Sequence, residues 1–270
     1  MEKSGYVEAY KQEAANFVQA LRSGIGKPAP QVPTCPEWNV NDLILHIGFV
    51  HRTWSKLLDE RMQTPPDFQA ADKSYLNIPT AYMAWSGDKK APEGAAVPAD
   101  LVNWFEEGTK LLEVSLANIE PEIAVWTFAT AQNAWHWHRM MPLETGMHRW
   151  DVQNTYGEAA PLEAEFAKAS IDFLFEVLLP ILRGGFRQGA RPGEGEVYHF
   201  HRTDGDGEWL VTFGKEATTV SYEHRKGDIA LRGTASDILL FLFGRQNADN
   251  LEVLGDQSLV ARFRELTPAI

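Results

Sequence analysis

Residue types that bind metals occur at helical spacing in this chain. Glu144 and His148 are four residues apart, so on a helix both side chains project from one face, a single turn apart. His46 lies at the edge of the apolar face of another predicted helix, and helices of a bundle can direct ligands to one cation. Two imidazoles and a carboxylate leave coordination positions open, as in catalytic zinc and non-haem iron sites. A surface ion pair or a packed histidine fits the spacing as well.

Asp151 is a second candidate for the same chemistry. It follows Glu144 by seven residues, which is about 700° of helix and close to two full turns. Its carboxylate can therefore orient the His148 ring and act in catalysis. An ion pair with Arg149 or a role at the helix end explains Asp151 equally well.

The segment 135–139, with sequence WHWHR, is unusually aromatic and basic. Within it, His138 and Arg139 are predicted to line a pocket and to contact a bound cofactor or cosubstrate, and a loop role is the alternative for the histidine. His51 lies about 140° around the helix from His46, so these two should not share a metal. Cys35 has no evident base nearby and is expected to be structural.

His199 and His201 occupy one face of a predicted strand and could mimic a metal-binding pair. The sequence supplies no evident further ligand for them. We therefore expect this pair to be packed or solvated.

Hydrophobic spacing in the first half of the chain predicts the helices that must carry His46, Glu144 and His148. Apolar residues recur at helical intervals over 6–22, 40–57 and 98–119. Asn39 is a predicted N-cap, with Asp42 at the third helical position. A fourth helix is expected to start or kink at Pro142 and to end before Gly157. Such helices, joined by a long connection, indicate a bundle. Residues 62–97 form that excursion, with a short helix near 81–85, and are expected to cover the site.

The second half of the chain has a different pattern. A helix is predicted over 162–182, followed by alternating segments typical of strands at 197–201, 209–213, 218–222 and 228–231. A helix over 235–243 and a short strand at 251–253 complete the pattern. The fold class is therefore α+β with two domains, a helical bundle at 1–157 and a small domain with an antiparallel sheet at 158–270.

Composition excludes several classes of protein. The chain has 270 residues, of which 44% are hydrophobic and 23% charged, so it is globular. A net charge of −12 argues against nucleic-acid binding. No apolar run is long enough to span a membrane, and the N-terminus has no signal core. The single cysteine fits a cytoplasmic location. We expect a monomer or homodimer.

Several segments resemble the mycothiol-dependent maleylpyruvate isomerase family, a branch of the DinB-like metal-binding bundles. They are VPTCPEWNVNDLILH at 32–46, ETGMHRWD at 144–151, GEWLV at 207–211, RGTAS at 232–236 and FGR at 243–245. The resemblance extends over nearly the whole chain in the same order. It implies a DinB-like four-helix bundle followed by the family's C-terminal α+β domain.

The resemblance also implies a function. The family's His-Glu-His ligands for a divalent metal, usually zinc, fall on His46, Glu144 and His148. The thiol mycothiol is implied as cosubstrate, and a small electrophile would be isomerised or S-conjugated. Arg245 matches the family's glycine–arginine motif and is expected to reach an interdomain cleft and bind a substrate carboxylate. The alternatives are a hydrolase or lyase that uses a metal hydroxide without thiol and a non-catalytic metal-binding protein.

Overall fold

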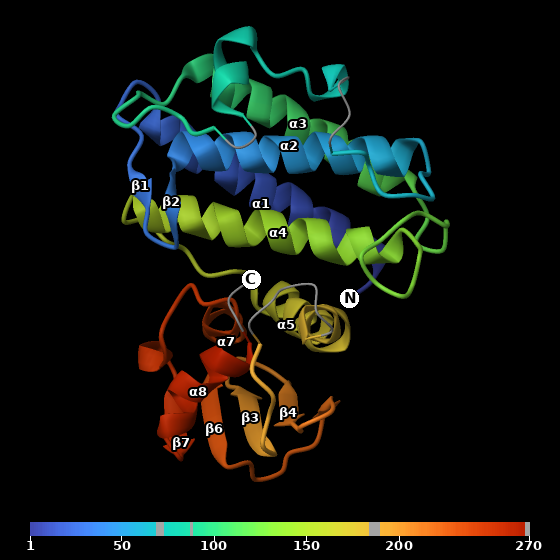
Figure 1. The fold of residues 1–270 in the computed structure, drawn as a ribbon, viewed down its shortest axis with the longest axis vertical. Helices are drawn as coiled ribbons and strands as arrows, with labels where there is room; N and C mark the ends of the chain where they lie inside the picture. Colours follow the sequence, from blue (N-terminus) through green and yellow to red (C-terminus); the bar gives the residue numbers. More distant parts are fainter. Residues whose placement is uncertain (69–72, 87–88, 184–189, 268–270) are drawn as a thin grey trace. The chain divides into compact units, whose positions relative to one another are not determined.

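The computed structural model describes residues 1–68, 73–86, 89–183 and 190–267. The chain divides into two compact units, Met1–Ala160 and Pro161–Ile270, slightly after the predicted boundary. The first unit is helical and the second contains a sheet covered by helices (Figure 1). This is the expected α+β class.

The long helices described in the first unit form the expected bundle. They are α1 (Lys3–Gly24), α2 (Val40–Asp59), α3 (Ala99–Asn118) and α4 (Trp135–Thr155). Helix α1 packs on α3 and α4, and α2 packs on the same two helices. The apolar stripes that predicted these helices are buried between them, with Phe17, Leu43, Ile47 and Phe105 fully inaccessible to solvent. The two-stranded antiparallel ribbon of β1 (Gln31–Val32) and β2 (Cys35–Asn39) connects α1 to α2.

The connection between α2 and α3 carries two 3₁₀ helices, η1 (Ser74–Leu76) and η2 (Thr80–Trp85), which confirms the short helix predicted there. Two hydrogen bonds attach it to α3. Trp104 Nε1 donates to the Leu76 carbonyl oxygen at 2.9 Å, and the Tyr82 hydroxyl donates to Asp100 at 2.5 Å. The connection is therefore held against the bundle.

Helix α4 begins earlier than predicted. It starts at Trp135, and Pro142 lies inside it rather than at its first turn. An interior proline removes a hydrogen bond and costs about 3 kcal/mol. Packing offsets this cost, because the early turns bury Trp137 and Met141, and Trp137 stacks on Trp54 with ring centroids 4.0 Å apart. The sequence left open whether the helix starts or kinks at the proline, because the packing of the earlier turns involves residues far apart in the chain.

The second unit is built on a five-stranded sheet of order β5-β4-β3-β6-β7. Its strands are β3 (Glu196–Arg202), β4 (Glu208–Phe213), β5 (Thr218–Ser221), β6 (Ile229–Gly233) and β7 (Glu252–Gly255). The sheet is antiparallel, as expected, apart from the parallel pair β3–β6.

Helices pack with this sheet. The predicted helix over 162–182 is α5 (Ala164–Phe173), which continues through the π-helical η3 (Leu174–Leu178) into α6 (Leu179–Ile181). Helix α7 (Ala235–Leu242) was also predicted, whereas the 3₁₀ helix η5 (Ala248–Asn250) and α8 (Ser258–Leu266) were not. Helix α8 adds Phe263 to the aromatic core of the unit, against Tyr198 and Phe241.

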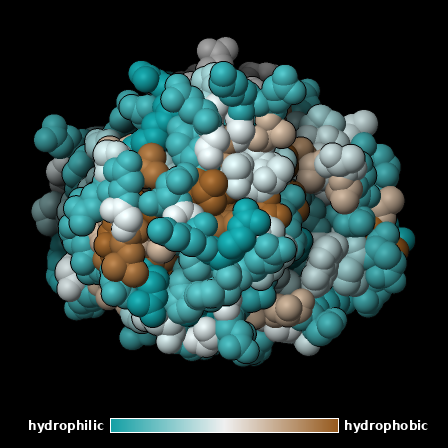
Figure 2. Space-filling view, turned by 90° about the horizontal axis from the view of Figure 1, so that it is seen from below, coloured by the Kyte–Doolittle hydropathy of each residue, from teal (hydrophilic) through white to brown (hydrophobic). Residues whose placement is uncertain are grey.

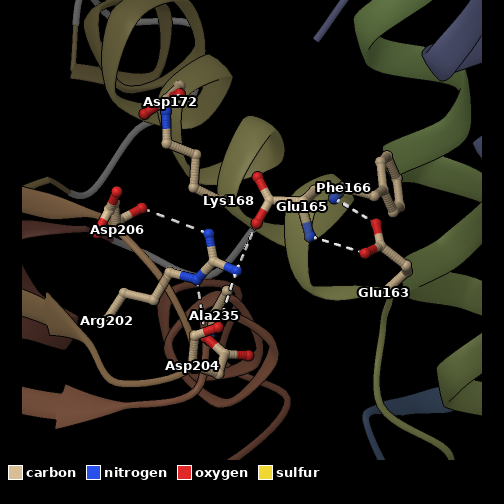
Figure 3. A network of polar contacts seen from close by, with 9 residues as sticks. All are labelled: Glu163, Glu165, Phe166, Lys168, Asp172, Arg202, Asp204, Asp206 and Ala235. Carbon is tan, nitrogen blue, oxygen red and sulfur yellow. Dashed lines mark hydrogen bonds and ion pairs between the residues drawn. The ribbon is translucent and has the colours of Figure 1, made fainter.

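A buried arginine joins three elements of this unit (Figure 3). Arg202, at the end of β3, is 3% exposed and donates to Glu165 of α5 at 2.7 Å and to Asp204 at 2.8 Å. Asp204 also accepts the backbone N–H of Ala235, the first residue of α7. A buried charge is tolerated only when it is paired, and here the pairing fixes α5, α7 and the β3–β4 turn together.

The surface drawn in Figure 2 is mostly hydrophilic, with hydrophobic side chains gathered in small areas. Among the described residues, no helix combines the length and apolar character needed to cross a membrane.

Candidate metal centre and its pocket

Helices α2 and α4 bring His46, Glu144 and His148 together. Glu144 Oε1 lies 3.6 Å from His46 Nε2 and 3.6 Å from His148 Nε2. The two imidazole rings are 5.6 Å apart, centroid to centroid. One ligand atom from each of the three residues lies within 4.8 Å of the others. The side chains predicted from spacing therefore converge on one point in the bundle.

The start of α2 positions His46. The Asn39 side chain accepts the backbone N–H groups of Asn41 and Asp42, and Asp42 accepts the N–H of Asn39, so both sides of a capping box are made. The ring of Trp38, directly before the cap, lies against His46 with centroids 4.6 Å apart. Cap and indole together fix where this imidazole points.

Asp151 holds the other imidazole. His148 Nδ1 donates to Asp151 Oδ2 at 2.8 Å, and Thr34 donates to Asp151 Oδ1 at 2.6 Å. The Cys35 sulfur is 4.0 Å from Asp151 Oδ2. The contact between His148 and Asp151 places a proton on Nδ1 of His148. It leaves Nε2, the nitrogen that faces Glu144, free to act as a ligand.

The charges of this cluster are strongly coupled. Burial by itself raises the pKa of Glu144, but the neighbouring His148 and His46 outweigh it and hold this pKa well below its usual value. Burial lowers the pKa of His148, yet Asp151 and Glu144 raise it to about 9. In the metal-free protein His148 is therefore positively charged at neutral pH, with a second proton on Nε2. A cation bound at Nε2 would displace this second proton, while Nδ1 keeps its proton toward Asp151.

A cavity of about 1070 Å³ opens beside His46. Its walls come from the end of β2, from α2 and from the connection between α2 and α3, so part of the 62–97 segment does line the space next to the predicted site. The aromatic lining includes Trp38, Phe49, Phe68 and Trp85. Such a volume admits a small ligand together with a larger cosubstrate.

Lysines line the same cavity, and sequence reasoning missed them. Lys73, Lys89 and Lys90 are all part of its wall, and Lys90 Nζ lies 5.2 Å from the centre of the Trp38 ring. Among the described residues, the one acidic side chain in that wall is Asp42, which accepts the backbone N–H groups of Asn39 and Ala91. In a chain with a net charge of −12 this is a local concentration of cations suited to carboxylates. The only feature of the sequence that pointed to this cationic wall was the presence of three lysines in the connecting segment.

The other predicted site residues lie elsewhere. His138 is fully buried, with Nδ1 2.9 Å from the Ala134 carbonyl oxygen and Nε2 3.0 Å from that of Leu116. Its ring therefore faces backbone rather than the cluster. Arg139 is half-buried on α4. Neither residue is brought into the cluster, so their contact with a cosubstrate stays a prediction.

The structure also places His51, Cys35 and Arg245, three further residues considered in the sequence. His51 is buried and contacts Thr145 through Nε2 at 3.0 Å, apart from the three ligand candidates. Cys35 is near Asp151 and His148, which its sequence context did not indicate. Arg245 follows α7 in the second unit, where its Nη1 donates to the Phe243 carbonyl oxygen at 3.1 Å. Its contact with a substrate carboxylate also stays a prediction.

The donor set fits a divalent metal of the zinc type. Two imidazole nitrogens and one carboxylate oxygen are the ligands of catalytic zinc sites, which keep a further position open. The Nδ1 contact with Asp151 matches the carboxylate–histidine pairing usual behind such ligands.

Asp151→Asn is expected to weaken metal binding about 10- to 100-fold, the usual effect of losing a group that orients a ligand. The amide keeps the size of the side chain but can offer its N–H₂ group to Nδ1, which favours the wrong tautomer. Competition with a chromogenic zinc chelator measures the affinity. Thr34→Val, which removes only the support behind Asp151, should have a smaller effect. Equal zinc affinity for Asp151→Asn and the unmodified protein would contradict the orienting role.

Comparison with known proteins identifies the family and the fold. The family model described as the mycothiol maleylpyruvate isomerase N-terminal domain matches residues 7–153, and the corresponding C-terminal domain model matches residues 164–262. No curated protein matches the chain. Two solved structures, a mycothiol-dependent maleylpyruvate isomerase and a histidine-to-alanine variant of it, align with TM-scores of 0.53 and 0.52. Both are 13% identical, and the alignments cover 94% of this chain and 93% of theirs, which shows a common fold. With both domain models matched in order over most of its length, the chain belongs to the mycothiol maleylpyruvate isomerase family.

Proposed function

We propose that this protein is a metal-dependent enzyme that uses mycothiol to isomerise or S-conjugate a small electrophile carrying a carboxylate. The observation that carries the proposal is that His46, Glu144 and His148 converge on one point in a member of this family, and that His46 also lines a cavity of about 1070 Å³. His46 belongs to both the cluster and the cavity wall, so a ligand in the cavity would reach the metal position.

A zinc ion held by His46, Glu144 and His148 would lower the pKa of a thiol, which is near 8.5 when free, and keep it as the reactive thiolate at neutral pH. Glu144 is ionised under these conditions because its pKa is well below the usual value. Asp151 keeps Nε2 of His148 turned toward the cation by holding Nδ1.

The cavity residues would hold and activate the electrophile. Addition of a thiolate to an activated double bond moves negative charge onto the acceptor, and nearby cations stabilise that charge. Lys73, Lys89 and Lys90 supply such cations and can bind a carboxylate. The aromatic wall, which includes Trp38 and Trp85, would shield a bound thiolate from water. Arg245 is a further candidate for a carboxylate contact through its family motif.

Cobalt substitution tests the use of a thiol directly. We expect Co(II)-loaded protein to develop a thiolate-to-cobalt charge-transfer band in the near ultraviolet when mycothiol is added, saturating at one equivalent per site. S-methyl mycothiol is the matched control, because the methyl group replaces the ionisable S–H hydrogen and leaves the rest of the molecule unchanged, and it should give no thiolate band. Bound cobalt without a band would contradict the proposal and favour a metal hydroxide or a non-catalytic metal-binding protein.

A further inference from the structure

The second unit contains a separate cluster of three histidines and a glutamate. His199 and His201 project from β3, Glu208 begins β4, and His224 lies in the segment that follows β5. One ligand atom from each of these four residues lies within 4.8 Å of all the others. Nothing in the proposed chemistry uses them.

Strand register places the first three residues together. His199 and His201 are two apart on β3 and so share one face of the sheet. Glu208 pairs directly with His201 across the antiparallel β3–β4 ladder. Tyr198 and Phe200, which alternate with the histidines, are fully buried in the aromatic core on the opposite face. The histidines are therefore on the face of β3 away from this core.

The crossover segment between β5 and β6 brings His224, the fourth residue, to the cluster. The chain leaves β5 at Ser221, which pairs with Leu210 of β4, and enters β6 beyond β3 at Ile229. It must therefore pass both β4 and β3. At Gly227 a Cβ atom would lie 2.6 Å from the Val197 carbonyl oxygen and 3.2 Å from the His199 backbone nitrogen. The crossover thus lies directly against β3, which brings His224 to the cluster.

Each histidine contacts the carboxylate. Glu208 Oε2 is 2.5 Å from His199 Nε2, and Glu208 Oε1 is 2.6 Å from His201 Nδ1 and 2.9 Å from His224 Nδ1. The imidazole rings are 5.3 to 6.0 Å apart. The side chain of His199 is 7% exposed and that of His224 is 75% exposed. The cluster therefore extends from the sheet to solvent, which gives an ion an entry path.

We propose that His199, His201, Glu208 and His224 form a second metal site, specific for zinc or a similar transition metal, that attaches the 222–228 crossover to the sheet. Imidazole and carboxylate are ligands that zinc prefers, and four protein ligands are typical of a structural site. Three imidazoles select against calcium and magnesium, which require oxygen ligands.

Small side-chain rotations would complete the coordination. At bond lengths of about 2.0–2.2 Å, tetrahedral ligand atoms are roughly 3.3–3.6 Å apart. The ligand atoms that are now up to 4.8 Å apart need to move closer together. The short contacts between the histidine nitrogens and the Glu208 oxygens need to lengthen as the metal replaces the proton shared in each contact. The neighbouring cation, Arg232 on β6, pairs with His201 in the parallel register but donates to Glu252 at 2.6 Å. Its charge is thereby partly neutralised.

Metal stoichiometry is the primary test. His46→Ala/His148→Ala removes the proposed first site, and this variant is expected to keep one bound Co(II) or Zn(II) per chain. Adding His199→Ala and His201→Ala should then abolish the remaining metal. Glu223→Gln is the matched control, because it removes the same charge as Glu208→Gln from an exposed position beside His224. We expect Glu208→Gln to weaken binding at least tenfold and Glu223→Gln to leave it unchanged.

Proteolysis of the unmodified chain provides a test that needs no variant. Arg225 and Lys226 are exposed in the crossover and are targets for trypsin. If zinc attaches the crossover to β3, saturating zinc should slow cleavage after these residues at least tenfold, and the Glu208→Gln variant should lose that protection.

The two tests can overturn the proposal independently of the first site. If the His46→Ala/His148→Ala variant binds no metal, or binds the same amount with and without His199 and His201, the second site is refuted. An unchanged cleavage rate with zinc bound would refute the attachment of the crossover. Circular dichroism establishes that each variant is folded. If only the first site fails, the His46→Ala/His148→Ala variant should bind as much metal as the unmodified protein. Metal would then be lost only in variants that lack His199 and His201.

Discussion

His148→Ala is expected to remove the metal from the first unit while the fold survives. The substitution deletes one of three protein ligands, so zinc affinity should fall by more than about 100-fold, the upper end for residues that only orient a ligand. Activity that depends on the metal should be lost in proportion. Elemental analysis of the dialysed protein, combined with circular dichroism, measures both effects. The second metal site proposed above stays intact in this variant, so one metal per chain should disappear rather than all.

His136→Ala is a matched control for this experiment. His136 lies on the same helix, is 4% exposed and is outside the ligand cluster. Its replacement should lower stability without changing the metal content. Full metal occupancy in His148→Ala would show that the ligands are assigned wrongly, and equal metal loss in both variants would show that the effect is structural.

Glu13→Ala is expected to destabilise the helical unit by about 3–5 kcal/mol, the usual cost of removing one partner of a buried ion pair. Arg149, the residue after His148, is 1% exposed, and Glu13 is 4% exposed. The guanidinium Nε donates to Glu13 Oε2 at 2.6 Å and Nη2 donates to Glu13 Oε1 at 3.2 Å. The pair links α1 to α4 beside the metal ligands. Urea unfolding measured for both variant and unmodified protein gives the difference.

Glu8→Ala provides the comparison on the same helix. Glu8 is exposed, and its ion pair with Lys11 is long, at 4.0 Å. Its loss should therefore change stability by less than about 1 kcal/mol. The double variant Glu13→Met/Arg149→Met should recover much of the stability, since a buried ion pair can be replaced by packed apolar groups. A small loss for Glu13→Ala would mean that solvent reaches Arg149 when the carboxylate is removed.

Local rules account for most of the secondary structure. Apolar spacing located α1, α2 and α3, and Asn39 with Asp42 identified the start of α2, because capping and helical periodicity depend on residues within one or two turns. The spacing of Glu144 and His148 was sufficient to place both on one helix face. The position of His46 on another helix of the bundle made it a candidate third ligand, and the family motifs assigned it to the same set.

Long-range packing decided what local rules could not. Helix α4 extends back to Trp135 because Trp137 packs on Trp54, a contact between residues far apart in the chain. His138 appeared suited to a pocket, but the same early turns bury it against backbone carbonyls. In the second unit, His199 and His201 lacked further ligands in the sequence, and Glu208 and His224 supply them only through strand pairing and the crossover.

The sequence by itself therefore determined most of the helices, the general order of strands, and the types of side chain available for metal chemistry. Those features depend on short-range periodicity, capping and turn residues. Only the tertiary structure decided which polar groups meet, because partners such as Glu13 and Arg149 are separated by more than half of the chain. It also decided where the lysines of the α2–α3 connection lie, since a segment without periodicity is positioned by what it packs against.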